Sequence, residues 1–549
     1  MKKYIFIIIT ALFINEAQSQ SWQWAISCGK SNGDDIGRIA IDNNSNLYLA
    51  GTFYSSFGIF GTDTFITNGI SDIVFAKLNS SGTFQWVHQI GGNNSPSDLE
   101  AAAGVNYNAA ANCVFVAGMF YDSISLGGTT LHSGGANDIF FAKYDANGNC
   151  AWAKKAGSNS FDLTVNITSD DNGNLYVIGN VNDTAYFDTY AVPKGYFLVK
   201  YNNSGNCQWA KKIISDASIN GISCYNNEIV VAGNTVNDTI IIDSDTLFST
   251  NNFGADLVIA AFDLNGSLIW AKLDASGTVS YAAEAEYDNS GNIYITGVVA
   301  GFDTVKFGNV IFPPSGTQIF LVKYDNNGTV TWARESASSY DCRIFDLSVS
   351  NGDGSCYLTG RFQDTITFGN YTVNGASFGE EHMFISRYDA NGDCLGIRHT
   401  QVDIDGPNPG RGYSVVQDAN NICYVAGQFS NTANFDTYSL TSVWQKDIFI
   451  AKIDAITGIG GKEINPNNHL LIYANPNKGT FNIKVPDEVK TFKKAWLLIF
   501  DNTGRETARF SLDNESDYPY LDVTNAAKGM YTVKLVQGDK NYSGKLIVE

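Results

Sequence analysis

Five histidines are the first candidates for acid–base chemistry in this sequence, because imidazole titrates near neutral pH without any perturbation. They are scattered, and no nucleophile motif accompanies them: His88, His132, His382, His399 and His469. Neither a G-x-S-x-G nor an H-E-x-x-H arrangement occurs. With 55 acidic residues, some carboxylate pair will always suit glycoside hydrolysis, so such pairs carry no specific signal. We therefore predict no catalytic residue and no cofactor.

Four aspartates recur shortly before an expected strand, and together they could form a ring of carboxylates: Asp35, Asp98, Asp162 and Asp341. If those strands line a central channel, the carboxylate oxygens could bind Ca²⁺. The simpler alternative is that each aspartate accepts backbone N–H groups in a turn. The Asp-Asn-Gly-Asn turns lack the glutamate at the twelfth position of a calcium loop. No metal ligand is therefore predicted.

Nine cysteines would permit disulfides if the chain is exported. Cys113 and Cys150 are separated by almost the same number of residues as Cys356 and Cys394. In each pair the first cysteine opens a Tyr/Val-rich strand and the second precedes the outer strand of the same repeat. This recurrence predicts two disulfides within repeats, with free, half-buried thiols as the alternative for either pair. No C-x-x-C spacing indicates a zinc site.

The elements that would position these residues are strands. Aromatic residues make up 13% of the chain and charged residues only 16%, which excludes a disordered chain. The 53 glycines and the lack of a long helical pattern indicate strands joined by turns. The net charge of −20 repels phosphate backbones, so no nucleic acid is expected as a partner.

Two strings each recur seven times at a spacing of about 63 residues. One runs from DIVFAKLNSSGTFQW at Asp72 to DIFIAKIDAITGIGG at Asp447, and the other, as in NLYLAGTF, ends its core in a glycine from Gly51 to Gly427. Turns such as YDANGN place Asn-Gly where a hairpin needs a positive φ. Each unit is therefore expected to be a four-stranded antiparallel meander.

The outer strand of the repeat carries a tryptophan in five units, a glycine in the sixth and has no counterpart in the seventh: Trp86, Trp152, Trp209, Trp270, Trp332 and Gly396. A displaced copy, QWAISCG around Trp24, precedes the first unit. The sequence thus predicts an all-β, seven-bladed β-propeller over residues 20–461, a monomeric ring whose N-terminal strand closes the last blade and removes exposed sheet edges.

The repeat consensus, Asp-aromatic-aromatic-Ala-Lys-Tyr-Asp followed by Asn-Gly-Asn, Trp-Ala and Tyr-Val-Ala-Gly, resembles the bacterial SBBP-type β-propeller repeat family from Trp24 to Asp454. The resemblance implies the propeller fold and an extracellular setting, and it implies no specific activity. The N-terminus agrees with that setting. Residues 1–19 read as a signal peptide, with Lys2 and Lys3 before an apolar run too short to span a membrane.

After a linker at residues 462–468, the composition changes: residues 469–549 have nearly balanced charge and read as the short strands of a β-sandwich. This segment resembles the C-terminal sorting domain of the type IX secretion system, with Ala474 where the family usually has proline. The resemblance is carried by Asn475, Pro476, Gly479, Gly504, Gly529, Tyr531 and Lys534, with Asp501 and Asp522 beside them. It implies contact with the type IX secretion machinery, removal by its sorting protease, and attachment to or release from the outer-membrane surface.

Two functions follow from these observations. The first is a secreted or surface-displayed, non-catalytic scaffold that binds an extracellular glycan or protein through exposed loops. The alternative is a secreted carbohydrate-active hydrolase or lyase that uses the propeller channel. That alternative needs a non-repeated loop with convergent charged side chains, and the seven units are too alike in length to show one.

Overall fold

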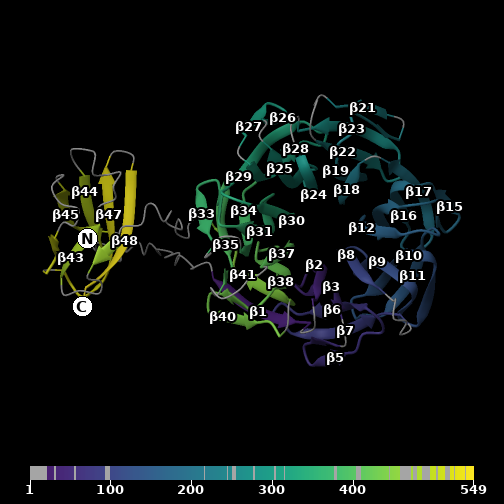
Figure 1. The fold of residues 1–549 in the computed structure, drawn as a ribbon, viewed down its shortest axis with the longest axis horizontal. Coiled ribbons are helices and arrows are strands. Elements are labelled where there is room, and N and C mark those ends of the chain that lie inside the picture. The colour runs from purple at the N-terminus through teal and green to yellow at the C-terminus, as the bar shows by residue number, and fades with distance from the viewer. Residues whose placement is uncertain are drawn as a thin grey trace, which may run out of the picture. The chain divides into compact units, whose positions relative to one another are not determined.

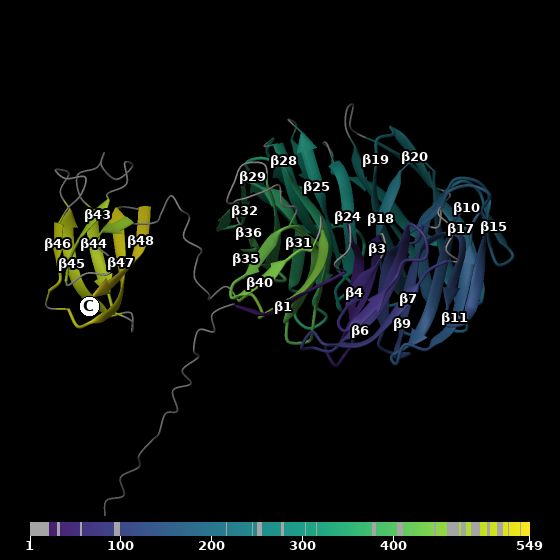
Figure 2. The same cartoon turned by 60° about the horizontal axis from the view of Figure 1, so that its bottom comes forward.

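The computed structural model describes two stretches of the chain. These are residues 21–457 apart from 30–32, 55–56, 93–98, 216, 244, 250–254, 276–278, 302–303, 315, 376–379, 403–409 and 444–445, and residues 471–548 apart from 474–478, 485–494, 502–504, 513–519, 525 and 538–539. The predicted signal peptide, Asp98, His469, Asn475, Pro476 and Gly504 lie outside the described residues. The chain divides into two compact units, Met1–Gly460 and Gly461–Glu549 (Figures 1 and 2).

The first unit is built on four-stranded antiparallel meanders, as the repeats predict, and all the regular elements described are strands. One meander extends to six strands, because its last strand also pairs with the first strand of a short hairpin, residues 365–368. The first sheet pairs β2 (Asp35–Ile41), β3 (Leu47–Tyr54), β6 (Ser71–Leu78) and β7 (Phe84–Ile90) in that order. The next sheets follow the same meander: β8 (Ala101–Asn108), β9 (Cys113–Leu126), β10 (Thr129–Asp145) and β11 (Cys150–Ala156); β12 (Asp162–Ser169), β13 (Leu175–Val181), β16 (Gly195–Tyr201) and β17 (Cys207–Ile214); β18 (Ser218–Tyr225), β19 (Glu228–Thr235), β22 (Asp256–Asp263) and β23 (Leu268–Asp274); β24 (Val279–Tyr287), β25 (Ile293–Gly301), β28 (Gly316–Tyr324) and β29 (Val330–Ser338); β30 (Cys342–Val349), β31 (Cys356–Gln363), β34 (Glu381–Tyr388) and β35 (Cys394–His399).

The last sheet of the unit takes its outer strand from the other end of the chain. Its inner strands are β37 (Arg411–Gln417), β38 (Cys423–Phe429) and β41 (Asp447–Ile453), and β1 (Trp22–Cys28) pairs antiparallel with β41. In Figure 1 the purple β1 lies beside the green β41. The first strands of successive sheets also contact one another in a circuit, from β2 through β8, β12, β18, β24 and β30 to β37 and back to β2. Figure 1 shows these strands around a common centre.

Short hairpins follow the second strand of several repeats and complete the unit: β4 (Gly58–Phe60) with β5 (Asp63–Phe65), β14 (Ala185–Phe187) with β15 (Tyr190–Val192), β20 (Thr239–Ile242) with β21 (Asp245–Phe248), β26 (Val305–Phe307) with β27 (Val310–Phe312), β32 (Thr365–Phe368) with β33 (Tyr371–Asn374), and β39 (Thr432–Phe435) with β40 (Tyr438–Thr441) and the two-residue β36 (Gln401–Val402).

Outer-strand tryptophans join each sheet to the next. Each indole N–H donates to a carbonyl in the next sheet's outer turn, at 3.1–3.4 Å: Trp24 to Ser80, Trp86 to Ala146, Trp152 to Asn203, Trp209 to Leu264, Trp270 to Asn326 and Trp332 to Ala390. The glycine of that turn packs on the same indole. Gly205, for example, has φ +80°, and a Cβ there would lie 2.8 Å from Trp152. The repeated glycine of the outer turn therefore serves both the turn and the seam between sheets.

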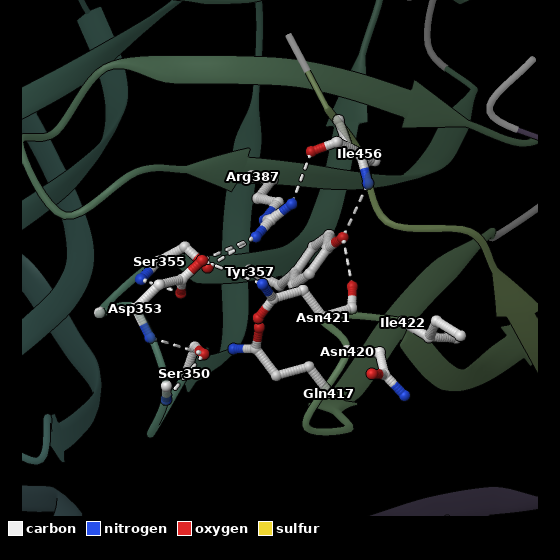
Figure 3. A network of polar contacts seen from close by, with 12 residues as sticks. Ser350, Asp353, Ser355, Tyr357, Arg387, Gln417, Asn420, Asn421, Ile422 and Ile456 are labelled. Carbon is white, nitrogen blue, oxygen red and sulfur yellow. Dashed lines mark hydrogen bonds and ion pairs between the residues drawn. The ribbon is translucent and has the colours of Figure 1, made fainter. Parts of the chain in front are cut away.

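The seam between the sixth sheet and the last is built differently (Figure 3). Gly396 stands where the tryptophan would be, and a Cβ there would lie 2.8 Å from Cγ2 of the fully buried Ile456. The Ile456 N–H donates to the Tyr357 hydroxyl at 2.9 Å, and Arg387 donates to the Ile456 carbonyl at 2.9 Å. Ile456 thus fills the place of the missing indole.

The two predicted disulfides do not form, because a strand separates the cysteines of each pair. Cys113 on β9 and Cys150 on β11 both flank β10, where they pair with Asp145 and Tyr144. Cys356 and Cys394 lie on opposite sides of the single residue Tyr388. Two strand spacings amount to about 10 Å, which exceeds the roughly 7 Å that a disulfide can bridge. All four thiols are free.

The second unit contains two antiparallel sheets around one apolar core. The smaller sheet pairs β42 (Leu471–Tyr473), β43 (Thr480–Lys484) and β46 (Tyr520–Asp522). The larger has the order β45 (Glu506–Leu512), β44 (Ala495–Phe500), β47 (Gly529–Gln537) and β48 (Lys540–Val548). Along β44, Ala495, Leu497 and Ile499 are buried, and this alternation sets the face that packs inward.

Candidate functional site

The first strand of each repeat contains a β-bulge where it pairs with the second strand. The repeated glycine of the second strand explains this bulge. A Cβ on that glycine would collide with a carbonyl of the first strand, at 2.2 Å from Ala101 O for Gly118 and 1.9 Å from Arg411 O for Gly427. The ladder shifts register just beyond this contact in every repeat of the first unit. The residue that follows the shift, here named the bulge position, is Arg38, Gly104, Asn166, Gly221, Glu284, Asp346 or Ser414. Bulges re-aim side chains at such points.

These strands surround a cavity of about 660 Å³, lined by residues from β2, β8, β12, β18, β24, β30 and β37. Four of the bulge positions line it, namely Arg38, Asn166, Glu284 and Asp346, and the strand that carries Ser414 reaches it through Val415. At the other two positions the neighbouring strand comes close, since a Cβ on Gly221 would lie 2.5 Å from Ala285 N. Charged side chains therefore stand at the bulge positions of β2, β24 and β30, and glycines at those of β8 and β18.

One polar network links the charged bulge positions. Arg38 forms ion pairs with Glu284, at 2.5 Å, and with Asp346. Asn166 donates to both Glu284 oxygens at 3.0 and 3.2 Å. The hydroxyl of Ser414 and the N–H of Val415 each donate to Asp346 at 2.8 Å. Side chains from repeats far apart in the chain are thus held together by mutual hydrogen bonds.

Negative charge exceeds positive charge in this cavity, since Arg38 is the one cationic residue among its described lining residues. Burial raises the pKa of Glu284 to about 7, against the opposing attraction of Arg38. Burial also raises the pKa of Glu286 well above its usual range, and Asp346 and Glu284 raise it further. One Glu286 oxygen accepts the N–H of Val349 at 2.6 Å.

Tyrosines and amides line the part of the cavity beside the first turns of the repeats. Tyr107 stacks on Tyr48 with ring centroids 5.7 Å apart, and Tyr225 lies 6.1 Å from Tyr287. The amides on these turns are exposed: Asn172, Asn226, Asn227, Asn289 and Asn351. Such a wall offers hydrogen-bond donors, acceptors and ring faces to a polar ligand.

The four histidines that the structure describes are not among the residues that line the cavity. His88 packs against Trp86 with centroids 5.0 Å apart, and His132 is exposed on β10. His382 and His399 lie in the sixth sheet with centroids 6.3 Å apart. Burial lowers the pKa of His382 to about 4, and His399 lowers it further, so His382 is neutral at physiological pH.

The described members of the predicted aspartate set also lie outside the cavity lining. Asp162 accepts N–H groups from Ser158 and Asn182, at 2.5 and 3.1 Å, as the turn alternative requires. Asp341 pairs with Arg361 at 2.6 Å. In the part of the chain that the structure covers, no group of three or more His, Cys, Asp or Glu side chains has the geometry of a metal site.

The cavity network was missed from the sequence, although a signal for it exists. The bulge position falls about 13 residues before each repeated glycine, and the repeats differ most in charge there. Aligning the repeats on the glycine places Arg38 and Glu284 in one column and Asp346 one residue before it.

Comparison with known families confirms the prediction for the C-terminal segment. Residues 471–549 match the family described as the secretion system C-terminal sorting domain. The match supports export by the type IX secretion system, contact with its machinery, and an extracellular or cell-surface location. No helix of the described chain is both long and apolar enough to cross a membrane.

Similarities over the repeats are weaker. An uncharacterized WD repeat-containing protein of Acanthamoeba polyphaga mimivirus is 27% identical over 194 residues, which is 33% of this chain. The chain spans only 13% of that relative's length. Among solved structures, the endosialidase of phage phi92 aligns with 95% of this chain at 10% identity and a TM-score of 0.35. The alignment includes 87% of the endosialidase chain. A puromycin hydrolase covers 85%, with 61% of its own chain covered, at 10% identity and a TM-score of 0.38. These scores are too low for either enzyme to serve as a template for this chain.

Proposed function

We propose that this chain is a secreted or surface-displayed, seven-bladed β-propeller of the SBBP type that binds a glycan in its central cavity without catalysis. Export is supported by the sorting domain at residues 471–549. Closure of the propeller is supported by the pairing of β1 with β41 and by the contacts that run from β2 around to β37 and back.

Ligand binding is supported above all by the bulge position. Its backbone is the same in each described repeat, yet its side chains range from glycine to arginine and glutamate. A residue needed only for the fold would repeat together with the fold, as the seam tryptophans do. The four bulge positions that line the cavity instead give it an asymmetric wall, which is what recognition of an asymmetric ligand requires.

A glycan suits this wall better than an apolar ligand. A cavity of about 660 Å³ lies in the size range of small-molecule sites. Exposed amides such as Asn172 and Asn289, together with the carboxylate of Asp171, can exchange hydrogen bonds with sugar hydroxyls. Tyr107 and Tyr225 add ring surfaces with a polar tip.

The absence of catalysis is part of the proposal. It is supported by the ion pairs and hydrogen bonds that the buried carboxylates already form. Arg38 and Asn166 occupy Glu284, while Arg38, Ser414 and Val415 occupy Asp346, so neither carboxylate is free to attack or to protonate a substrate. The second candidate, a carbohydrate-active hydrolase, rests on Glu286. Its raised pKa and its place on the cavity wall are those expected of a general acid.

Glycan-array screening of the full chain, followed by calorimetry on the best ligand, tests the proposal. Asn172→Ala together with Asp171→Ala should weaken binding at least tenfold. Asn147→Ala is a matched control, because Asn147 has the same turn geometry, with its N–H on Asp145 at 2.8 Å, and lies outside the cavity lining. Equal affinity of the double variant and the control would contradict the cavity site. Turnover on a polysaccharide panel that Glu286→Gln abolishes would replace binding with hydrolysis.

A further inference from the structure

A second pocket, of about 560 Å³, lies within the C-terminal unit and draws its wall from separate parts of that unit. Ile499 and Asp501 come from the end of β44, Thr507 and Ala508 from β45, and Asp522 from β46. The segment that leads into β47 supplies Val523, Ala526, Ala527 and Lys528, and β47 itself supplies Gly529 and Tyr531. The pocket opens where the two sheets of the unit end.

The floor of this pocket is apolar and fixed in place. Ile499 and Tyr531 are buried, and the Tyr531 hydroxyl donates to the Ala527 carbonyl at 2.6 Å. Gly479 supports the wall from behind, because its carbonyl accepts the N–H of Val523 at 2.6 Å and a Cβ there would lie 2.5 Å from Thr524. The residues that surround the floor are small, and this leaves the space open: Ala508, Ala526, Ala527 and Gly529.

The rim of the pocket carries charges of both signs. Arg505 lies 3.2 Å from Asp501 and its side chain is 80% exposed. Asp522 is exposed, and the hydrogen bond from the Thr524 N–H lowers its pKa, so it is ionised at neutral pH. Lys528 completes the rim. A rim with both positive and negative side chains is complementary to a polypeptide, which carries groups of both signs. It is less suited to a phosphate or a metal ion, which carries charge of one sign.

Four residues of the segments that mark the sorting domain in the sequence converge on this pocket: Asp501, Asp522, Gly529 and Tyr531. Buried Tyr531 supports the fold, and Asp522 accepts the Thr524 N–H while its side chain remains exposed at the pocket edge. Exposed residues that recur with a motif at a concave surface point to recognition.

We infer that this pocket is where the export machinery holds the tail, by inserting one large apolar side chain of a protein segment over Tyr531 between the charged edges. The volume admits one such anchor, and buried anchors of this kind dominate many protein interfaces. The inference rests on the proposed export of the chain through its sorting domain.

Filling the pocket tests this inference in a type IX-competent host that expresses the full chain. Ala527→Trp places a large ring at the mouth, at an exposed position of the pocket wall. Thr532→Trp is the matched control, since Thr532 is exposed on β47 and lies outside the pocket lining. We expect surface-displayed protein to fall at least tenfold for Ala527→Trp and to change less than twofold for Thr532→Trp. Equal display of the two variants would overturn the inference.

Two further variants separate folding and export from recognition. Asp522→Asn keeps the oxygen that accepts the Thr524 N–H but removes the charge, so it should lower display several-fold without exposing the core. Normal display of both Asp522→Asn and Ala527→Trp would reject the pocket. Deletion of residues 471–549 should abolish display. If the deleted chain still reaches the surface, the export role itself fails, whereas loss on deletion combined with normal display of both point variants rejects the pocket alone.

Discussion

The seams between sheets and the wall of the central cavity are built from the same repeats. The residue type at the seams is nearly constant from repeat to repeat, whereas the residue type at the cavity wall changes. At the seams, an indole N–H meets a turn carbonyl at 3.1–3.4 Å in repeat after repeat. At the bulge position, the same backbone carries Arg38, Glu284 or glycine. The contrast separates positions that maintain the fold from positions that are free to acquire a binding site.

The seam at Gly396 sharpens this contrast. The last repeat has no outer turn of its own, because its outer strand is β1, so a tryptophan at position 396 would lack its usual turn carbonyl. Ile456 replaces the indole, and its carbonyl accepts from Arg387 as turn carbonyls elsewhere accept from lysines such as Lys77. One departure from the repeat is thus balanced by another.

Removing β1 should have the largest effect on the seam side of the comparison. Deletion of residues 20–29 exposes the edge of β41 and removes the buried Trp22. We expect the single cooperative transition to be lost when unfolding is followed by calorimetry. Gln23→Ala, at an exposed position of the same strand, should keep that transition. A deletion variant that melts like the parent would show that β1 does not complete the last sheet.

Truncating Ile456 should have the next largest effect. Ile456→Ala creates a cavity at a fully buried site, and we expect the free energy of unfolding to fall by about 2–5 kcal/mol in urea titrations. Ile241→Ala, at a position that is 61% exposed, should change it by less than about 0.5 kcal/mol.

The same seam can be tested by restoring the tryptophan of the other repeats and removing the isoleucine that replaces it. Gly396→Trp alone should destabilise because of the collision with Ile456, and adding Ile456→Gly should recover part of the loss. Strict additivity of the two substitutions would mean that Ile456 does not occupy the place of the indole.

On the cavity side, we expect a pH dependence that the seams lack. The folded pKa of Glu284, about 7, lies above its unfolded value of 4.5, so the folded chain binds the extra proton. The stability contributed by this group is complete below pH 4.5 and is lost as the pH rises through 7, by up to about 3 kcal/mol. Glu284→Gln should remove this component when unfolding free energies of both proteins are compared from pH 4.5 to 8. Parallel pH profiles would contradict the raised pKa.

Removing a single seam hydrogen bond should have the smallest effect. Trp209→Phe keeps most of the ring and deletes the bond to the Leu264 carbonyl, which should cost about 1 kcal/mol. Trp152→Phe should cost the same within about 0.5 kcal/mol, because the bond from Trp152 has the same length of 3.1 Å. Markedly unequal losses in chemical denaturation would show that the seams are not equivalent.

Repetition explains which features could be predicted from the sequence. The strands, the turns and the displaced copy around Trp24 recur often enough to be recognised, and the all-β meander follows from them. The sequence shows Gly396 as a departure from the repeat, but its partner Ile456 lies 60 residues away, near the end of the last repeated string, and no motif links the two. The cysteine prediction is wrong because similar spacing in the sequence does not imply proximity: the strand order places Tyr388 between Cys356 and Cys394. The cavity network depends on register across all repeats, which no single motif contains.

The pairing of β1 with β41 also governs when this molecule can finish folding. Gln23 and Asp454 hydrogen-bond across 431 positions of sequence, so the earliest strand to be synthesised finds its partner among the latest of its unit. Every intervening sheet can form from local contacts, whereas this one must wait for the whole stretch to emerge. Until then both β1 and β41 carry unsatisfied backbone groups, ready to pair with another chain. We therefore expect the pairing of β1 with β41 to be the slowest step in the folding of this unit and the step most exposed to aggregation.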